Sequence, residues 1–518
     1  MTQIFIALFL ACSIFLYADW AEETLMGMTR EEKVGQFFAI SIAPPRGEKH
    51  LRHIQSFLKS YPVGGVLLKQ AHPEEQVSFL NAVQESSKIP LLTFADAEWG
   101  LGMRMRETFS YPRNLTLGAV QNLELLREMG RQIGKQCQLV GAHINLAPVV
   151  DINTNPENPV IHRRAFGDDS FQVSLHAQAL YQGMQEMGIL ACVKHFPGHG
   201  DTSIDSHHDL PLVTHPLERL QSIEFVPFSQ AIQRGVACVM SAHLLVPAID
   251  SIPCTFSYPL ITQILQEQLG FEGLVITDAL NMKALTNYYE KGEVGLKAFL
   301  AGHHVLLYGS HRDEVVDAIL DEFVPAAFQA IMSAEILEEE LDRRVLKILK
   351  IKQNLGLHEN RFVSEREDLM EKLHDRVYAE LISLLFEEAV TLFRDEGLPS
   401  QGEKIAFVQV GREEISPFCA DLQETFDVTP IQYEQGISLD GYDQIILALY
   451  QAEVPKELRM LHATTVIFTT PYVLKDCPKS GTIIVGYEGV RDAEKAVLKV
   501  IKKEIEAKGK LPVSTFKD

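Results

Sequence analysis

Eight short apolar runs recur between residues 34 and 308, and they constrain the fold of this chain more than any other feature. Helical patterns such as 215–233 and 312–322 lie between most of them. Runs that are apolar at nearly every position indicate parallel strands that are covered on both faces. Eight strand–helix units fit a (β/α)8 TIM-type barrel, which uses about 250 residues as one unit. The runs are VGQFFAI (34–40), GGVLLK (64–69), PLLTFAD (90–96), HINLAPVVD (143–151), ILACVK (189–194), VACVMSAH (236–243), GLVITD (273–278) and HVLLY (304–308).

Several of these runs end in a polar residue, and the matching positions predict a site. In a (β/α)8 barrel the active site lies at the carboxyl ends of the strands. Any one of these residues could cap a helix or lie in a surface loop, but five at matching positions favour a shared site. They are Asp96, Asp151, Lys194, His243 and Asp278.

A second pattern, after the barrel region, predicts a smaller α/β domain. A helix is expected over 333–357, with Ser333 as its N-cap and Gly356 as its stop. Four further apolar runs follow it: KIAFVQV (404–410), DQIILAL (443–449), TTVIFTT (464–470) and GTIIVGY (481–487). We therefore expect a catalytic barrel over 22–360, a linker over 361–400 and an α/β sandwich domain over 401–518.

The apolar segment near the start of the chain is typical of an exported protein. The segment IFIALFLACSIFL (4–16) is too short to span a bilayer, which takes about 20 residues, but it suits the apolar region of a secretory signal. We expect residues 1–18 to be a signal peptide or an N-terminal anchor, with lipidation at Cys12 as an alternative. The protein would then be periplasmic or membrane-associated, and cytoplasmic if the leader does not function. The formal net charge of −22 argues against a nucleic-acid partner.

The stretch KHFPGHGDTSIDSHHDLP (194–211) follows the fifth run and concentrates imidazole and carboxylate side chains. Its prolines and glycines break regular structure and predict a loop. Asp205 and His207 are close in sequence, so the carboxylate can orient the imidazole and raise its basicity. This pairing suits general acid–base catalysis near neutral pH. A purely structural role for the histidines, packing and capping the loop, is the alternative.

A metal site is the other alternative for this loop. The candidate ligands are His195, His199, His207 and His208. Their spacing matches no common zinc pattern, and the chain has no HExxH motif. We therefore expect neither a metal nor a cofactor.

Asp278 ends the seventh run, in GLVITDALNM (273–282), and a helical pattern follows it. Aspartate is favoured at helix N-caps, which would explain it without any function. At the carboxyl end of a barrel strand, the same carboxylate could instead attack an electrophilic carbon such as the anomeric centre of a sugar. The residues alone leave both interpretations open.

The loop motif resembles the signature of family 3 glycoside hydrolases, and specifically of their β-N-acetylglucosaminidase branch. KHFPGHGDT followed by DSH is the part most typical of that branch. The resemblance implies a (β/α)8 barrel followed by an α/β sandwich domain, as in the two-domain form of the family. Similar segments extend along nearly the whole chain: EEKVGQFF (31–38), DAEWGLGMR (96–104), NLAPVVDINTNPENPVIHRRAFG (145–167), VITDALNM (275–282) and GKLPVS (509–514).

The resemblance also implies a retaining mechanism with a role for particular residues. Asp278 would be the nucleophile, His207 the general acid and base, and Asp205 the residue that orients His207. A histidine in place of the usual second carboxylate repels an incoming anion less, so phosphate could compete with water. The residues that would hold the hydroxyl groups of the terminal N-acetylglucosamine (GlcNAc) are Asp96, Arg164, Lys194 and His195.

Two segments leave questions open. Single-domain relatives carry DQEGG where this chain has DAEWG (96–100), so Trp99 could stack on a sugar ring or pack against the barrel rim. This difference bears on subsite preference rather than on the type of reaction. In the second domain, TTPYVLKD (469–476) is the candidate for a loop that faces the site, with a merely stabilising domain as the alternative.

Three functions are consistent with these residues. The first is an exo-β-N-acetylglucosaminidase, a type of β-N-acetylhexosaminidase, that acts on peptidoglycan fragments such as GlcNAc–anhydroMurNAc peptides. The second is a β-glucosidase or a GlcNAc phosphorylase of the same family. The third is a non-catalytic protein that binds the cell wall, which the presence of Asp278, His207 and Asp205 disfavours.

Overall fold

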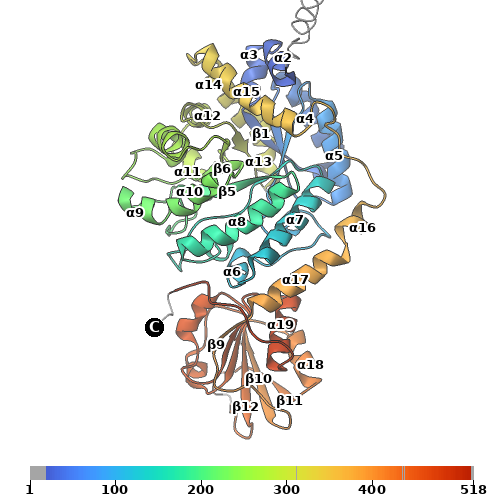
Figure 1. The fold of residues 1–518 in the computed structure, drawn as a ribbon, viewed down its shortest axis with the longest axis vertical. Helices are drawn as coiled ribbons and strands as arrows, with labels where there is room; N and C mark the ends of the chain where they lie inside the picture. The colour runs from blue at the N-terminus through green and yellow to red at the C-terminus, as the bar shows by residue number, and fades with distance from the viewer. Residues whose placement is uncertain (1–18, 311, 435, 437, 515–518) are drawn as a thin grey trace, which may run out of the picture.

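The computed structural model describes residues 19–310, 312–434, 436 and 438–514. The predicted leader over 1–18, with Cys12, lies outside the described residues. In the described part of the chain, no helix is both long and apolar enough to cross a membrane. A barrel and a smaller sheet domain follow one another along the long axis of the molecule (Figure 1).

The first sheet is an eight-stranded parallel barrel, which confirms the predicted fold class. Its strand order is β7-β6-β5-β4-β3-β2-β1-β8, and a bridge between Ile276 and Val305 joins the two end strands. Each predicted run overlaps one strand, and the strands are buried along nearly their whole length, as continuous apolar runs require. The strands are β1 (Phe38–Ile42), β2 (Gly65–Leu68), β3 (Leu92–Ala95), β4 (Ile144–Asn145), β5 (Leu190–Phe196), β6 (Cys238–Ser241), β7 (Leu274–Thr277) and β8 (Leu306–Tyr308).

The first strand begins later than its predicted run because helix α3 (Arg30–Gly35) occupies the start of that run. Thr29 caps this helix. The Glu32 N–H donates to the Thr29 hydroxyl at 3.2 Å, and the Thr29 N–H donates to the Glu32 carboxylate at 3.0 Å. This reciprocal pair satisfies two donors that a helix end otherwise leaves unpaired.

Helices surround the barrel (Figure 1). Helix α7 shows how the sequence forms them, because Leu126, Met129, Ile133 and Cys137 are buried on one face at helical spacing. The predicted helix over 215–233 is two helices, α9 and α10, since Ile223 leaves the helical region between them. The helices are α2 (Trp20–Met26), α3, α4 (Gly47–Ser60), α5 (Pro73–Glu85), α6 (Asn114–Leu117), α7 (Leu123–Leu139), α8 (Ser170–Glu186), α9 (Leu217–Ser222), α10 (Phe225–Gln233), α11 (Lys283–Thr286), α12 (Lys291–Leu300), α13 (Asp313–Ala318), α14 (Val324–Met332) and α15 (Glu338–Asn354).

The helix that ends the barrel region begins later than predicted. Ser333 does not cap it but closes the preceding helix α14, and α15 starts only after Leu337. Gly356 follows the end of α15 with a φ of 72°, in the left-handed region that favours glycine, so the predicted stop is confirmed.

The second sheet is mixed and has the order β11-β10-β12-β13-β14-β9. Strand β9 is antiparallel to β14. Each of the four predicted runs contains a strand, but the pattern misses β9, which is short, and β11, which is an exposed edge strand. Because β9 lies within 361–400, the second sheet begins before residue 401 and the predicted linker is too long. The strands are β9 (Thr391–Arg394), β10 (Lys404–Val410), β11 (Asp427–Gln432), β12 (Gln444–Leu449), β13 (Thr464–Ile467) and β14 (Ile483–Val485), and the helices are α16 (Leu369–Leu373), α17 (Arg376–Ala389), α18 (Pro417–Gln423) and α19 (Arg491–Ile501).

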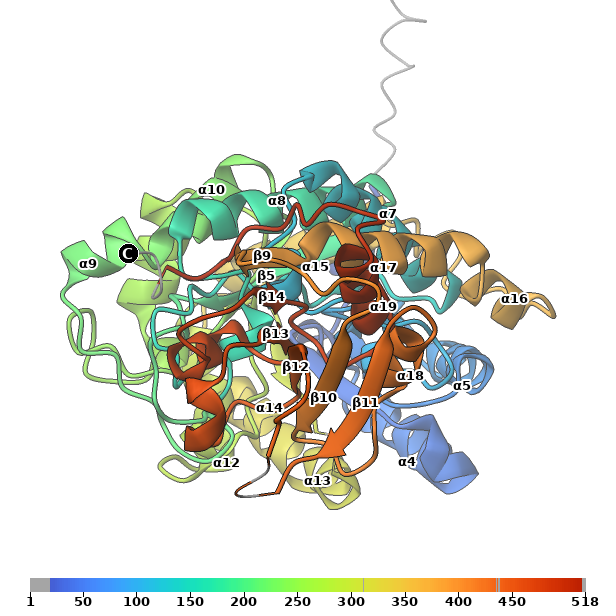
Figure 2. The ribbon, with the colours of Figure 1, turned by 90° about the horizontal axis from the view of Figure 1, so that it is seen from below.

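The chain joins the two domains twice. Helix α17 leads from the barrel into the second domain, and the last described residues run back along the barrel (Figures 1 and 2). There the Lys510 N–H donates to the Ala119 carbonyl at 3.0 Å and the Asp168 N–H donates to the Pro512 carbonyl at 3.3 Å. The second domain is thus held against the barrel at both of its ends.

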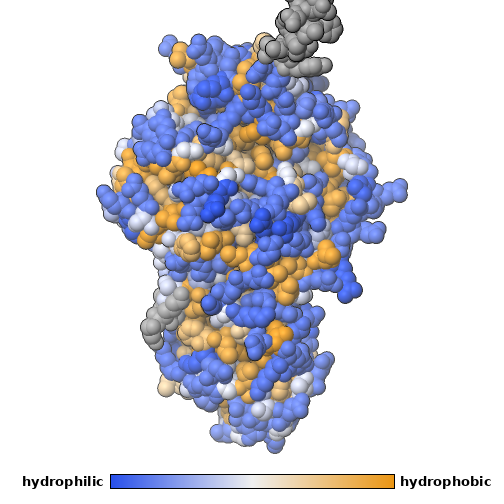
Figure 3. All heavy atoms as spheres, viewed as in Figure 1, coloured by the Kyte–Doolittle hydropathy of each residue, from blue (hydrophilic) through white to orange (hydrophobic). Residues whose placement is uncertain are grey.

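Hydrophilic residues cover much of the face shown in Figure 3, with hydrophobic residues scattered among them.

Candidate functional site

A buried network of charged side chains lies at the carboxyl ends of β3 and β5. Asp96 directly follows β3, and Lys194 lies in β5. The Lys194 Nζ is 3.0 Å from Asp96 Oδ1 and 2.8 Å from Glu98 Oε1. Arg164, in the single helical turn His162–Arg164, donates to both Glu98 oxygens at 3.0 and 2.6 Å. Arg104 donates to the second oxygen of Asp96.

Opposite charges in this network compensate for its burial. The side chains of Lys194 and Glu98 are only 5% and 2% exposed. Burial acts to raise the pKa of both carboxyls, but Lys194 and Arg104 hold the pKa of Asp96 well below its usual value. Arg164 and Lys194 similarly lower the pKa of Glu98 to about 2. The network is therefore ionised at neutral pH and presents fixed donors and acceptors to a ligand.

His195 lies beside this network, and Asp151 fixes its ring. The His195 Nδ1 is 2.7 Å from Asp151 Oδ2, and Asp151 Oδ1 accepts from the His195 and His199 N–H groups at 3.1 and 2.7 Å. The other ring nitrogen, Nε2, is 3.4 Å from the Arg164 guanidinium. The structure thus brings together all four residues predicted to hold a sugar: Asp96, Arg164, Lys194 and His195.

Asp278 is the first residue after β7, at the same edge of the barrel. It is not a helix N-cap, because the next helix, α11, begins at Lys283 behind Met282. Its Oδ1 accepts from the Ala279 N–H at 2.7 Å. Burial acts to raise the pKa of Asp278, but His243, His195, the Ala279 N–H and Lys194 lower it to about 2. An ionised carboxylate at this position has the charge that a nucleophile requires.

Asp205 and His207 form the predicted pair, in the loop between β5 and α9. The His207 Nδ1 is 2.7 Å from Asp205 Oδ1, which also accepts the His207 backbone N–H at 2.8 Å. The side chains of His207 and Asp205 are 60% and 28% exposed. With Nδ1 held by the carboxylate, Nε2 is the ring nitrogen that a ligand can reach.

This loop packs against the segment that follows Asp278. The Ala284 N–H donates to the Ser206 carbonyl at 3.3 Å, and the Asn287 side-chain amide donates to the His208 carbonyl at 3.3 Å. His243, at the end of β6, links the two groups. Burial lowers the pKa of His243, Asp278 raises it, and His195 and His207 lower it further. The charges of His207 and Asp278 both act on His243, and the packing of the loop places it on the same side of the barrel as the segment that follows Asp278.

Trp99 follows Glu98 and is half-buried at the rim of the barrel. The Arg113 guanidinium lies over its ring, 3.3 Å from the ring centroid. The backbone N–H of Arg113 and the Thr116 hydroxyl in turn donate to Glu488 at 2.8 and 2.6 Å. One face of Trp99 is therefore covered by an arginine that the second domain holds in place.

The segment 469–476 of the second domain also reaches the barrel. Asn153 donates to the Tyr472 hydroxyl at 2.7 Å, and Arg163 donates to the Thr469 hydroxyl at 2.9 Å. Both partners lie in the loop after β4 that carries Arg164. The predicted loop thus contacts the segment that carries Arg164, one of the residues predicted to hold a sugar.

Two of the residues predicted to share a site at the strand ends, Asp151 and His243, lie in it as expected, although their partners could not be predicted. Glu98 and Arg104 extend the predicted set, and both lie in the segment DAEWGLGMR. Lys69, just after β2, gives a weaker signal, a single cation at the end of an apolar run.

In the part of the chain that the structure describes, no group of three or more His, Cys, Asp or Glu side chains could hold a metal ion.

Together these features define a class of protein: a (β/α)8 barrel whose open end holds ionised donors and acceptors beside a carboxylate, suited to a small polar ligand. Residues 29–351 match the glycosyl hydrolase family 3 N-terminal domain. The chain belongs to this family, which confirms the resemblance seen in the sequence.

Three relatives place the chain within the family. Beta-hexosaminidase A of Pseudoalteromonas piscicida is 28% identical over 372 residues, which are 67% of this chain and 62% of that protein. A beta-N-acetylglucosaminidase/beta-glucosidase of Cellulomonas fimi is 29% identical over 350 residues, 65% of this chain and 60% of that protein. The chain thus spans less than two thirds of the length of these two relatives. The structure of a glycoside hydrolase family 3 beta-N-acetylglucosaminidase from Paenibacillus sp. str. FPU-7 has a TM-score of 0.79 and 30% identity, covering 94% of this chain and 99% of that one.

Proposed function

We propose that this chain is a retaining exo-β-N-acetylglucosaminidase, a glycoside hydrolase that releases terminal β-linked GlcNAc. One observation carries the proposal: the loop that holds the carboxylate-bound imidazole of His207 packs against the segment that follows the ionised carboxylate of Asp278. This arrangement pairs a proton donor with a nucleophile. The names of the relatives support the choice of GlcNAc as the sugar.

In the first step, Asp278 attacks the anomeric carbon and forms a glycosyl ester. The bond from that carbon to the leaving oxygen breaks, and the imidazolium of His207 donates its Nε2 proton to this oxygen. Asp205 accepts the Nδ1–H of His207 at 2.7 Å, which stabilises the cationic ring before transfer and fixes its tautomer afterwards.

In the second step, neutral His207 takes a proton from water, and the water oxygen attacks the anomeric carbon. The bond to Asp278 breaks and its electron pair returns to the carboxylate. Two displacements at one carbon retain its configuration. The buried network holds the sugar during both steps, since Asp96 accepts hydroxyl protons while Lys194, Arg164 and His195 donate to hydroxyl oxygens.

The natural substrates that we propose are peptidoglycan fragments, in which GlcNAc is the terminal sugar of GlcNAc–anhydroMurNAc peptides. Export, through the leader over 1–18, would bring the enzyme to this material in the periplasm. Digestion of purified muropeptides, with the released sugar identified by mass spectrometry, tests the substrate. Fractionation of the producing cells tests the compartment.

The second candidate function is a β-glucosidase or a GlcNAc phosphorylase. A relative is named beta-N-acetylglucosaminidase/beta-glucosidase, and a neutral imidazole repels phosphate less than a carboxylate would. Hydrolysis of the 4-nitrophenyl β-glycosides of GlcNAc and glucose, each with and without phosphate, separates the candidates. We expect a preference for GlcNAc. A stronger preference for glucose, or no turnover of either glycoside, would contradict the proposed function, and absence of turnover would favour a non-catalytic wall-binding protein.

A further inference from the structure

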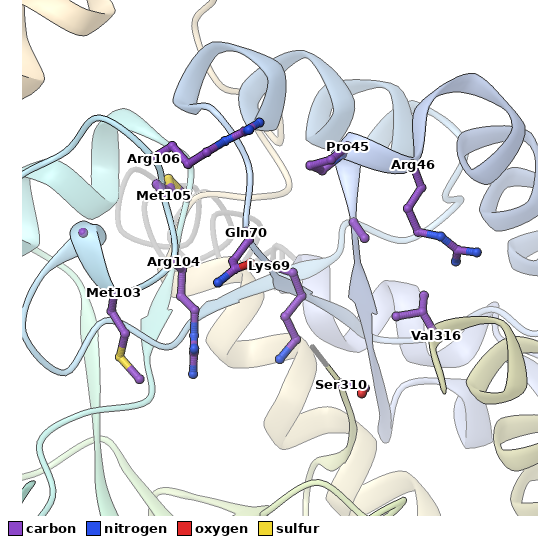
Figure 4. Close-up of a pocket in the computed structure, with 12 residues that line it drawn as sticks. Pro45, Arg46, Lys69, Gln70, Met103, Arg104, Met105, Arg106, Ser310 and Val316 are labelled. Atoms are coloured by element: carbon purple, nitrogen blue, oxygen red, sulfur yellow. The ribbon is translucent and has the colours of Figure 1, made fainter. Parts of the chain in front are cut away.

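A cavity of about 690 Å³ opens beside the sugar-holding network. Its walls come from the segments that follow β1, β2, β3 and β8, so it lies at the same edge of the barrel as Asp96 and Asp278 (Figure 4). The polar side chains around it include Arg46, Lys69, Arg104, Arg106 and Ser310. Among the described residues that line it, every charged side chain is a cation.

Most of these cations already have a carboxylate partner. Arg46 donates to both oxygens of Asp317 at 2.8 and 2.6 Å. Arg104 pairs with Asp96, and Arg106 lies 3.9 Å from Glu75. Their positive charges are therefore compensated within the protein.

Lys69 is different. Its side chain extends into the cavity beside Arg104 (Figure 4), and the residue is only 8% exposed. Its ammonium group forms no hydrogen bond or ion pair with another described residue. Burial, Arg104 and Lys194 lower the pKa of Lys69 to about 8, while Asp96 and Asp278 raise it. A buried ammonium without a partner is unfavourable, and an anion bound in the cavity would relieve it.

We propose that Lys69, with Arg104 beside it, binds an anionic group of the carboxylate or phosphate type in this cavity, next to the sugar. The inference rests on the proposed glycosidase function and deepens it. The anion has two sources: a carboxylate on the group to which GlcNAc is attached, or inorganic phosphate.

The two sources have different consequences. A carboxylate on the leaving group would strengthen substrate binding and leave the reaction a hydrolysis. Bound phosphate would replace water in the second step. One of its oxygens attacks the anomeric carbon, the bond to Asp278 breaks with its electron pair returning to the carboxylate, and the product is GlcNAc 1-phosphate.

The test uses the full chain and three variants. Lys69→Met removes the charge and keeps the length of the side chain, Lys69→Arg retains the charge, and Lys59→Met removes an exposed lysine on α4 as a matched control. The first arm compares kcat/KM for GlcNAc-β-1,4-MurNAc, which carries a free carboxylate, with that for its methyl ester. The second arm measures the rise in Tm and the yield of GlcNAc 1-phosphate as inorganic phosphate is added.

We expect the parent chain to favour the free acid over the ester, or to respond to phosphate, by about tenfold. Lys69→Met should abolish that preference, while Lys69→Arg and Lys59→Met retain it. If Lys69→Met loses the preference for the free acid, the anion is the carboxylate of the leaving group. If Lys69→Met loses the response to phosphate, the anion is phosphate. The proposal is overturned if Lys69→Met behaves like the parent chain in both arms, or if a parent chain that cleaves the nitrophenyl glycoside responds in neither.

Failure of the proposed function has a separate signature. A parent chain that cleaves no glycoside contradicts the glycosidase assignment, yet the Tm response to phosphate still reports on Lys69. If Lys69→Met does not fold, Lys69→Arg and the acid–ester comparison on the parent chain still decide the outcome.

Discussion

The buried network around Lys194 and the exposed loop that carries His207 lie at one end of the barrel but differ in burial and in the number of their ion-pair partners. Lys194 is 5% exposed and two carboxylates hold it, whereas His207 is 60% exposed and pairs with one carboxylate, that of Asp205, among the described residues. Rigid, desolvated donors and acceptors suit the proposed selection of a sugar, because they are oriented before it binds. A proton donor on an exposed loop, by contrast, can approach and leave a reacting oxygen. If the proposed roles hold, recognition and proton transfer are separable in this molecule.

The largest effect on activity is expected at Asp278, the proposed nucleophile. Asp278→Asn removes the charge that we propose attacks the anomeric carbon but keeps the shape of the side chain, so kcat/KM for 4-nitrophenyl β-GlcNAc should fall about 10⁴-fold or more. Stopped assays of nitrophenol release measure this, with thermal unfolding as a check that the variant folds. If Asp278→Asn and the parent chain are equally active, Asp278 is not the nucleophile.

His207→Ala tests the exposed region. Loss of a general acid costs about 10²–10⁴-fold when the leaving group needs a proton. We therefore expect a large fall in kcat/KM on GlcNAc disaccharides and a much smaller one on 4-nitrophenyl β-GlcNAc, since nitrophenolate leaves without a proton. Steady-state kinetics on both substrates measure the ratio. Equal losses on the two would contradict a role for His207 as the acid.

For the stability of the fold, the larger effect is expected in the buried network and the smaller one in the exposed loop. Lys194→Met leaves Asp96 and Glu98 buried without one of their shared partners, which typically costs about 3–5 kcal/mol. His207→Ala removes an exposed side chain and should change stability by no more than about 0.5 kcal/mol. Thermal unfolding of the two variants beside the parent chain tests this contrast. A lower Tm for His207→Ala than for Lys194→Met would refute the distinction between the regions.

The sequence pattern predicts the exposed region more completely than the buried one. Asp205 and His207 are neighbours in sequence, so their pairing follows from local chain geometry alone. Asp96, Arg164 and Lys194 could be chosen as candidates because they end strands or match family motifs. That Glu98 joins Arg164 to Lys194 depends on three segments meeting in space, which no local pattern records.

The same reason explains the successes and misses in the fold. Strands that are buried on both faces leave a continuous apolar run, and all eight barrel strands overlap one. Strand β11 lies at an exposed edge with a polar sequence, so it has no such run. The N-cap assigned to Ser333 fails because α14 continues to Met332 with Ser333 in helical geometry at its end, and α15 begins only after Leu337.

The pH dependence of stability sharpens the comparison further. The folded state lowers the pKa of Glu98 from 4.5 to about 2, so its ionised carboxylate stabilises the fold above about pH 4.5. That contribution is lost as the pH falls from 4.5 towards 2. The Tm difference between the parent chain and Glu98→Gln should therefore shrink between pH 6 and pH 3, as measured by thermal unfolding across this range.

Glu488 provides the control with the opposite sign. Burial raises the pKa of Glu488 more than Thr116 and Arg113 lower it, so its ionised form is unfavourable in the folded state. The Tm of the parent chain relative to that of Glu488→Gln should therefore be higher at pH 3 than at pH 6. The same trend in both variants would mean that the two carboxyls do not differ in this way.

The smallest effect is expected where the second domain reaches the buried network. Glu488 binds the Arg113 backbone and the Thr116 hydroxyl, and Arg113 covers the Trp99 ring beside Glu98. Glu488→Met removes the acceptor of both hydrogen bonds and weakens this support by about 1 kcal/mol, the typical worth of a hydrogen bond, so KM should rise by about fivefold while kcat is retained. Glu494→Met is the matched control, because Glu494 is also buried but bonds to Arg412 and Tyr450 within the second domain. This control variant should leave KM unchanged. An equal rise in KM for both variants would mean that the second domain stabilises the fold but does not specifically support the site.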